Sequence, residues 1–295
     1  TSPGYYTESN ASTTQIPCPL GKYNPVSGAN SVAMCLDADP GNFSAILGAL
    51  SQIPCPAGEY QPLSGQVSCL QADPGNFVQS QGEQSQEECQ PGGYQPYSGQ
   101  QNCIDADPGY FVDLVMATTQ TPCPSGTYNP NFSAMSQSSC LESEEGYYVA
   151  TEGSAVQDKC APGTYQPSPG QSTCLEADPG FFTSSEASSS QEECAPGTYQ
   201  PSPGQSTCLE ADPGFFTSSG ASSSQEECAP GTYQPSPGQS NCLEADPGFF
   251  VSEAGQSQQT PAPFDQFVSS ARSIVAESCP ENTITLQESS TSEDE

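Results

Sequence analysis

Short apolar runs recur along the chain at a fixed interval and are separated by polar turns. Residues 160–193, CAPGTYQPSPGQSTCLEADPGFFTSSEASSSQEE, are repeated at 194–227 with one change, Gly220 in place of Glu186. An altered copy starts at Cys228, and more diverged copies extend back towards the N-terminus. Self-similarity at a fixed period predicts a repeat architecture.

The 34-residue unit is itself double, because CAPGTY at 160–165 aligns with ADPGFF at 177–182. In the first half-repeat (A), positions 1 and 15 are Cys; in the second (B), position 1 is usually Ala. Position 4 is Gly and position 6 is Tyr or Phe in both. Seventeen half-repeats account for the chain once two three-residue insertions are allowed, in the A half-repeats that start at Cys18 and Cys123.

Position 4 predicts a left-handed turn in every half-repeat. Asp265 and Asn282 take this position in the last two half-repeats, and both residue types tolerate a left-handed backbone. The other half-repeats carry glycine there: Gly4, Gly21, Gly41, Gly58, Gly75, Gly92, Gly109, Gly126, Gly146, Gly163, Gly180, Gly197, Gly214, Gly231 and Gly248.

Pro-Gly and Ser-Gly pairs mark tight turns, and the Tyr- or Phe-bearing runs between them have room only for brief strands. We therefore expect small disulfide-rich repeats, mostly coil with short β-strands, in an elongated, solenoid-like rod. The expected organisation is a lone half-repeat at 1–17, units at 18–54, 55–88, 89–122, 123–159, 160–193, 194–227 and 228–261, and a degenerate segment with an acidic tail at 262–295.

The last segment departs from the polar pattern. Apolar residues fall at helical spacing between Pro263 and Cys279, which predicts one short amphipathic helix. They are Phe264, Phe267, Val268, Ala271, Ile274 and Val275. This helix would either cap the array, as solenoids require, or dock on the next subunit.

The composition indicates that the fold needs disulfide bonds for its stability. Only 33% of residues are hydrophobic, 15 are Cys, and Gly and Pro number 27 and 30, so the chain buries too little apolar surface to offset its ordering entropy. Regularly spaced Cys imply disulfides and an oxidising, extracellular setting. The absence of His and of CxxC pairs argues against metal binding.

Two disulfide pairings fit the spacing. The rival pairing joins position 15 to position 1 of the next unit, across nineteen residues. Either loop contributes roughly 3 kcal/mol in the chain-entropy model, so energetics does not choose. The local pairing is Cys18–Cys35, Cys55–Cys69, Cys89–Cys103, Cys123–Cys140, Cys160–Cys174, Cys194–Cys208 and Cys228–Cys242.

The motif C-x2-G-x-Y-x8-C resembles the cysteine-rich repeats of ephrin-receptor-like and tumour-necrosis-factor-receptor ectodomains. In that family the first two cysteines of a module bridge locally, so the resemblance implies the local pairing, as in Cys160–Cys174. The B half-repeat departs from the family pattern, with Ala177 and Gln191 where cysteines would stand. Ligand binding is not carried over, because the receptors' variable loops have no counterpart here.

The net charge of the chain limits the classes of partner that it can bind. The chain has 3 Lys+Arg against 35 Asp+Glu, a net charge of −32, which excludes nucleic acid and anionic membranes. Such a surface suits solubility, cation binding or a matrix of neutral glycans. No apolar stretch approaches the ~18 residues of a transmembrane helix, so we expect no membrane insertion of this chain.

Glycans are the expected covalent additions. Asn10, Asn42 and Asn131 each begin an N-glycosylation sequon, and the Ser/Thr-rich B half-repeats and Pro-Ser-Pro segments suit O-glycans.

Two acidic turns are weak calcium candidates: Asp37 with Asp39, and Asp105 with Asp107. Calcium requires six to eight oxygen ligands, whereas an Asp-Pro-Gly turn needs none, so we expect no bound cofactor.

Three groups of residues are candidate interfaces. Ile46, Leu47 and Leu50 replace the usual polar run, as do Leu114, Val115 and Met116; either they pack locally or they form a contact surface. The third group is Phe264, Phe267, Val268, Ile274 and Val275. Cys279 is left without a partner, which predicts an intermolecular disulfide.

The sequence offers few side chains that could act in catalysis. The chain has no His, and its basic residues are Lys22, Lys159 and Arg272. No nucleophile–base pair can be assembled, so we expect no enzyme. The sequence favours an extracellular structural protein that polymerises with itself, head to tail, into a surface filament such as a flagellar hair or other cell-surface appendage. The alternatives are the stalk of an adhesin or receptor, and a calcium-binding surface-layer protein.

Overall fold

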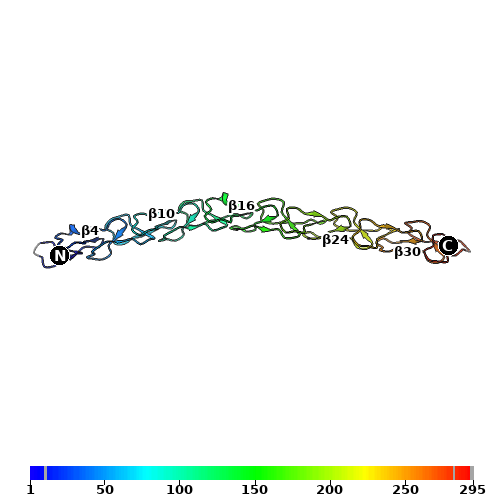
Figure 1. Cartoon of the computed structure of the whole chain (residues 1–295), viewed down its shortest axis with the longest axis horizontal. Helices are drawn as coiled ribbons and strands as arrows, with labels where there is room; N and C mark the ends of the chain where they lie inside the picture. Colours follow the sequence, from blue (N-terminus) through cyan, green and yellow to red (C-terminus); the bar gives the residue numbers. More distant parts are fainter. Residues whose placement is uncertain (10–11, 282, 293–295) are drawn as a thin grey trace. The chain divides into compact units, whose positions relative to one another are not determined.

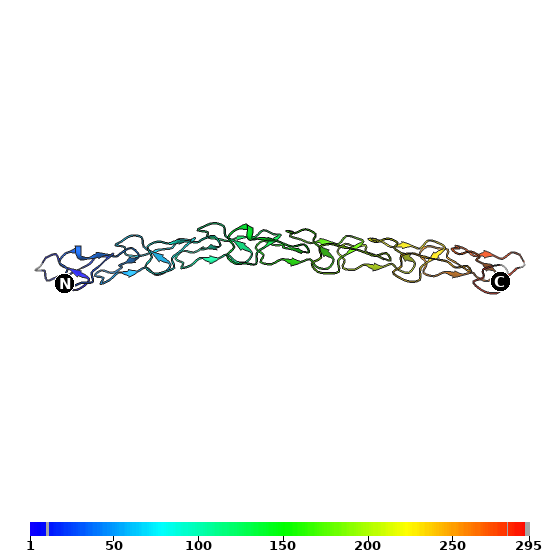
Figure 2. The same cartoon turned by 45° about the horizontal axis from the view of Figure 1, so that its top comes forward.

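The computed structural model describes residues 1–9, 12–281 and 283–292. The chain divides into two compact units: unit 1 is Thr1–Leu141 with Thr151–Val156, and unit 2 is Glu142–Ala150 with Gln157–Glu295. In each unit, small hairpins follow one another in sequence order (Figure 1), as the turned view also shows (Figure 2).

Every hairpin consists of two two-residue antiparallel strands, and no α-helix is found among the described residues. The brief strands expected from the sequence are therefore confirmed. The strands of unit 1, with the last of them reaching Glu142, are β1 (Tyr5–Tyr6), β2 (Ile16–Pro17), β3 (Lys22–Tyr23), β4 (Leu36–Asp37), β5 (Asn42–Phe43), β6 (Ile53–Pro54), β7 (Glu59–Tyr60), β8 (Leu70–Gln71), β9 (Asn76–Phe77), β10 (Glu87–Glu88), β11 (Gly93–Tyr94), β12 (Ile104–Asp105), β13 (Tyr110–Phe111), β14 (Thr121–Pro122), β15 (Thr127–Tyr128) and β16 (Leu141–Glu142). Those of unit 2 are β17 (Tyr147–Tyr148), β18 (Asp158–Lys159), β19 (Thr164–Tyr165), β20 (Leu175–Glu176), β21 (Phe181–Phe182), β22 (Glu192–Glu193), β23 (Thr198–Tyr199), β24 (Leu209–Glu210), β25 (Phe215–Phe216), β26 (Glu226–Glu227), β27 (Thr232–Tyr233), β28 (Leu243–Glu244), β29 (Phe249–Phe250), β30 (Thr260–Pro261), β31 (Gln266–Phe267) and β32 (Glu277–Ser278).

One half-repeat forms one hairpin, in which positions 5 and 6 pair with positions 17 and 16. In β19 and β20, Thr164 lies opposite Glu176 and Tyr165 opposite Leu175. The tight turn before β19 is closed by the Thr164 N–H, which donates to the carbonyl of Ala161 at 2.9 Å. The 17-residue period of the sequence is therefore the length of one hairpin with its connection.

Successive hairpins are joined by backbone hydrogen bonds that centre on position 4. The Gly163 N–H donates to the Thr183 carbonyl of the next hairpin at 2.8 Å, and the Gly163 carbonyl accepts from the Ala177 N–H at 2.9 Å. Two further bonds join the same hairpins, from the N–H groups at positions 7 and 11. Because these partners are backbone atoms, the contact recurs although the side chains around it change.

Position 4 also approaches the hairpin after the next. A methyl group built on Gly163 would collide with the carbonyl oxygen of Gly204, and one on Gly180 would collide with that of Ala221. The φ of Gly163 is +89°, as the sequence predicted for this position, and Asp265 takes a φ of +64° in its place. Asn282 lies outside the described residues. Glycine is therefore required here by conformation and by space.

Position 11, which meets position 4 from two hairpins away, is a second left-handed position that sequence reasoning missed. Gly204 and Gly238 have φ values of +71° and +70°. Six residues other than glycine adopt the same conformation at φ values of +55° to +62°: Met116, Ser133, Ala187, Ala221, Arg272 and Ser289. Each of these is strained relative to glycine.

The interior consists of thin rows of small residues. The position-1 residue is fully buried in every hairpin from Cys18 to Ala262. Position 7 is buried as well, and the sequence did not single it out. In one half-repeat position 7 is Val78, and in another it is Gln166. The Nε2 atom of Gln166 donates to the Thr173 carbonyl at 2.7 Å. Polar interior groups are therefore tolerated because each finds a backbone partner.

Two short 3₁₀ turns absorb the inserted residues. η1 (Val32–Met34) and η2 (Gln137–Ser139) lie in the A half-repeats that start at Cys18 and Cys123. In both, position 7 is a buried asparagine, Asn24 or Asn129, in place of the usual glutamine.

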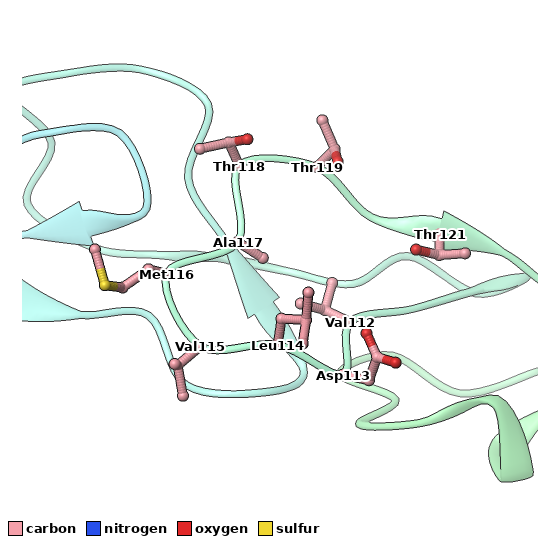
Figure 3. Close-up of a pocket in the computed structure, with 9 residues that line it drawn as sticks. All are labelled: Val112, Asp113, Leu114, Val115, Met116, Ala117, Thr118, Thr119 and Thr121. Carbon is pink, nitrogen blue, oxygen red and sulfur yellow. The ribbon is translucent and has the colours of Figure 1, made fainter.

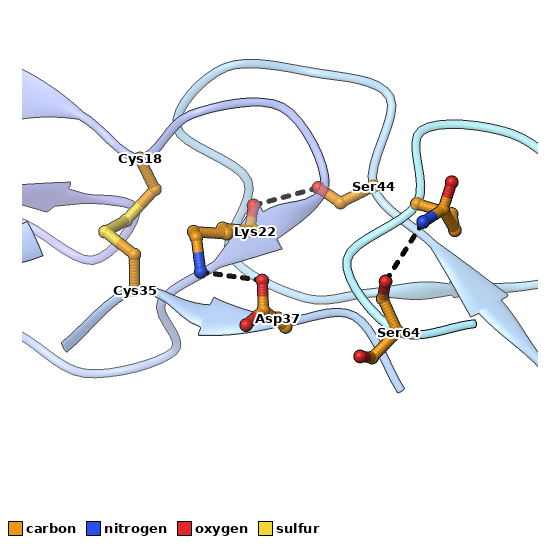
Figure 4. Close-up of polar contacts among 7 residues, drawn as sticks. Cys18, Lys22, Cys35, Asp37, Ser44 and Ser64 are labelled. Carbon is orange, nitrogen blue, oxygen red and sulfur yellow. Dashed lines mark hydrogen bonds and ion pairs between the residues drawn. A yellow bond between two sulfur atoms is a disulfide. The ribbon is translucent and has the colours of Figure 1, made fainter. Parts of the chain in front are cut away.

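The A half-repeats are closed by the local disulfides. The seven bonds are Cys18–Cys35, Cys55–Cys69, Cys89–Cys103, Cys123–Cys140, Cys160–Cys174, Cys194–Cys208 and Cys228–Cys242, with Cα–Cα distances of 5.7–5.8 Å. The pairing implied by the resemblance is thus the one formed. Figure 4 shows the first of these disulfides, Cys18–Cys35, to the left of Lys22 and Asp37.

The B half-repeats are closed by a clamp of two hydrogen bonds at the equivalent place. Gln191, at position 15, accepts from the Asp178 N–H at 2.7 Å and donates its amide to the Asp178 carboxylate at 2.8 Å. The same clamp joins Asp39–Gln52, Asp73–Gln86, Asp107–Gln120, Glu144–Gln157, Asp212–Gln225 and Asp246–Gln259.

The predicted C-terminal helix is wrong. Its residues form one more hairpin, β31–β32, in which Arg272 has a φ of +61°, a conformation no α-helix contains. The backbone bonds of the array explain this outcome: the Gly248 N–H donates to Val268, and the Arg272 N–H donates to Ala245, both at 2.8 Å. An isolated helix of this length is marginal in water, so the stacking contacts prevail.

We expect Ala221→Gly to stabilise the protein by about 1 kcal/mol, because alanine pays the cost of a left-handed backbone at φ +55°. Urea unfolding with intact disulfides measures this change. The matched control, Ala195→Gly, places glycine at exposed position 2 and should destabilise slightly. A loss of stability in both variants would contradict the assignment of strain to position 11.

We expect Gln191→Ala to destabilise its hairpin by about 1–2 kcal/mol, because one hydrogen bond of the clamp involves a charged carboxylate. Hydrogen exchange at the Cys194 and Phe182 amides reports local opening. The control is Gln205→Ala, whose amide donates to the Pro203 carbonyl two residues earlier. Equal protection from hydrogen exchange in both variants would show that the clamp does not stabilise its hairpin.

Candidate functional site

The candidate calcium acids are divided among other partners. Asp39 and Asp107 hold the amides of Gln52 and Gln120 in clamps. Asp37 pairs with Lys22 at 2.6 Å across β3 and β4 (Figure 4). Asp105 is exposed on β12. Among the described residues, no cluster of three or more His, Cys, Asp or Glu side chains is placed to hold a metal ion.

The basic residues each lie against a carboxylate. Lys159 lies 3.3 Å from Glu186, and Arg272 lies 3.9 Å from Glu244. Burial, followed by the nearby Asp107 and Tyr97, raises the pKa of the Tyr94 hydroxyl. The surface is therefore dominated by unpaired acidic charge.

The sequons differ in accessibility. Asn10 lies outside the described residues. Asn42 is half-buried in β5 and donates its amide to the Pro40 carbonyl at 3.3 Å, while the Ser44 hydroxyl of the same sequon is buried and donates to the Lys22 carbonyl at 3.0 Å (Figure 4). Asn131 is exposed.

Two of the three candidate interface groups lie on loops of unit 1 and face outward. Ile46, Leu47 and Leu50 are 62%, 60% and 57% exposed. This favours the contact-surface interpretation over local packing.

The second group lines a shallow open hollow of about 270 Å³ together with Val112 and the threonines that follow it. Leu114 is 68% exposed, and Val115 and Met116 are each about half exposed. Figure 3 shows Val115 and Met116 pointing away from the loop that carries them.

The third group is split by the C-terminal hairpin. Val268 is buried in a small cluster with Ala262, Ala276 and the partly buried Phe250. Phe267 lies half-buried in β31. The other three members, Phe264, Ile274 and Val275, are exposed.

Cys279 is the free cysteine of the described residues and is half-buried. Its N–H donates to the Asp265 carbonyl at 3.1 Å, which places it at position 1 of the half-repeat that follows β31 and β32.

Sequence reasoning missed a set of exposed apolar residues at position 16 of the A half-repeats. Leu175, Leu209 and Leu243 are 44–47% exposed and each lies opposite a tyrosine. The signal was present in the sequence, as the Leu or Ile that directly follows each second cysteine.

Within the described part of the chain, no helix has the length and apolarity needed to cross a membrane. The chain matches no curated protein. Residues 146–194 and 192–228 match the family model described as tyrosine-protein kinase ephrin type A/B receptor-like. Together with the seven disulfides, this match indicates an extracellular protein. Residues 146–228 are cysteine-rich, ephrin-receptor-like repeats, and the A half-repeats before and after them are closed by the same local disulfide.

Proposed function

We propose that the protein is a structural component of an extracellular, cell-surface filament or fibril, in which glycosylated copies assemble head to tail. Its work is mechanical and its main partner is a second copy of itself. Neither catalysis nor a bound cofactor is part of the proposal.

The observation that carries this proposal is the uniform contact between hairpins. The position-4 N–H donates to the position-7 carbonyl of the next hairpin in Gly163–Thr183 and equally in Gly248–Val268, both at 2.8 Å. A hairpin at the end of any such array offers the same donors and acceptors. A second copy is the partner whose hairpins match them, in a heterologous contact that repeats without closing.

Regularity supports the same conclusion. Residues 160–193 and 194–227 differ at one position, and Gly163 and Gly197 make equivalent contacts in both. Such duplication extends an array without adding a unique site. At low salt the excess of carboxylates opposes contacts between the flanks of neighbouring copies, which favours contacts at the ends.

The stalk of an adhesin or receptor is the second candidate, and the exposed apolar loops of unit 1 favour it. Ile46, Leu47 and Leu114 are at least 60% exposed, which suits a contact with a different protein.

We expect electron microscopy of the purified chain to show fibrils whose length increases with protein concentration. In the Cys279→Ser variant, which keeps the seven internal disulfides, covalent dimers should disappear from non-reducing gels and the fibrils should shorten on dilution. Reductant should shorten wild-type fibrils at least as much. Discrete particles of constant length at every concentration would contradict end-to-end assembly and favour the stalk.

We expect Asn131 to carry an N-glycan when the chain is secreted from a eukaryotic host, and Asn42 to carry little. The reason is that Asn42 is half-buried with its amide bonded to Pro40, which leaves little room for a glycan, whereas Asn131 is exposed. Glycopeptide mass spectrometry measures both occupancies, and Ser133→Ala is the control that should abolish the Asn131 signal. Equal occupancy at both sites would overturn the assignment.

A further inference from the structure

The hairpins of each unit form two columns. Because position 4 meets position 11 two hairpins later, each A hairpin packs on the next A hairpin, as Gly58 does on Gly99 and Gly163 on Gly204. Each B hairpin likewise packs on the next B hairpin, as Gly180 does on Ala221. The residues at one position of the A half-repeats therefore recur along one column.

The A column carries a ladder of aromatic–aliphatic pairs. In six disulfide-bonded A hairpins, a half-buried tyrosine at position 6 lies opposite a partly exposed leucine or isoleucine at position 16. The pairs are Tyr23–Leu36, Tyr60–Leu70 and Tyr94–Ile104 in unit 1, and Tyr165–Leu175, Tyr199–Leu209 and Tyr233–Leu243 in unit 2. Residues directly opposite each other in an antiparallel pair lie on the same face, so each pair forms one apolar surface.

In the disulfide-bonded hairpins of the A column, acidic side chains are kept off this face. Glu176 is the next residue after Leu175 and lies opposite Thr164, so it projects from the other side of the strand pair. The B column differs, because its position-6 aromatic Phe182 lies opposite Glu192. Within unit 2, the residue opposite the position-6 aromatic is therefore leucine in the disulfide-bonded hairpins of the A column, whereas Phe182 and Phe216 of the B column lie opposite Glu192 and Glu226.

The ladder is retained although the interior does not need it. Position 16 is Leu or Ile in all seven disulfide-bonded A half-repeats, whereas position 9 changes from Leu63 to Ser168. Leu175 stays 47% exposed, while positions 1, 4 and 7 supply the buried rows.

We propose that this ladder, the position-6 and position-16 pairs of the A column, binds the same ladder of a second copy, side by side. The surface of a single Tyr–Leu pair is far smaller than the ~1,200 Å² that a stable interface buries. Several pairs must therefore contact the partner at the same time and in register. A surface with the same repeat is needed to meet them, and a second copy has it. A two-fold contact places each pair against its equivalent.

This lateral contact is separate from the end-to-end contact proposed above. The acidic charge of both copies opposes this lateral contact. The contact should therefore strengthen in high salt, because the Debye length falls from ~10 Å at 0.1 M to ~3 Å at 1 M.

The test compares two triple variants of the full chain in the Cys279→Ser background by sedimentation velocity. Leu175→Glu, Leu209→Glu and Leu243→Glu place three charges on the ladder. The control, Ser168→Glu, Ser202→Glu and Ser236→Glu, places three charges on exposed loops of the same hairpins. We expect the parent to pair reversibly and more tightly in salt, and the ladder variant to pair at least about tenfold more weakly than the control.

A parent that does not pair in high salt, or two variants that pair equally, would overturn the proposal. Mass spectrometry of the intact disulfides checks that the ladder variant has folded. A second measurement uses the parent alone: photo-oxidation of mixed isotope-labelled and unlabelled copies should cross-link Tyr165, Tyr199 and Tyr233 between copies. Absence of such cross-links in associated material would also overturn it. Wider particles in electron micrographs report lateral pairing and longer ones report end-to-end assembly, so the two proposals fail separately.

Discussion

The approach of one backbone to another at position 4 is the constraint on which the structure depends. Gly163 uses its N–H and carbonyl for the next hairpin and its missing side chain for the hairpin after that. Two-residue strands alone would not hold a hairpin in water. Each hairpin is stable because four backbone hydrogen bonds and a close contact join it to its neighbours, and this explains how a chain with 33% hydrophobic residues stays ordered.

Closing each hairpin is a separate problem, and the chain solves it in two ways. Cys160–Cys174 constrains the unfolded chain covalently, while Asp178 and Gln191 close the following hairpin with two hydrogen bonds. Alternation means that, from Cys18 to Pro261, no hairpin lies more than one step from a covalent bridge. The B half-repeat is therefore a disulfide module that has kept its geometry with a weaker closure, which explains why the loss of two cysteines leaves the period unchanged.

The period, the brief strands and the position-4 turn could be predicted from the sequence because each depends on local chemistry: Gly, Pro-Gly pairs and evenly spaced Cys. The C-terminal helix was wrong because the spacing of Phe264, Val268 and Val275 fits a helix, whereas stacking on Gly248 is a long-range contact that spacing does not reveal. Strain at Ala221 and the buried position 7 were missed for the same reason: each is defined by a neighbour in another hairpin. The clamp was missed because Asp178 and Gln191 meet only once their own hairpin has formed.

The contacts between neighbouring hairpins also limit where a binding site can be. Interior positions of the described hairpins are small and are occupied by backbone contacts, so they leave little room for an enclosed site. Leu47 and Leu114 are local features that occur once each, whereas Leu175 and its equivalents recur at every A hairpin. A feature that occurs once suits a unique partner, and a feature that recurs with the fold suits a partner with the same period. The recurring apolar pairs are therefore best explained by contact between copies, and the exposed carboxylates by the need to keep the remaining surface in water.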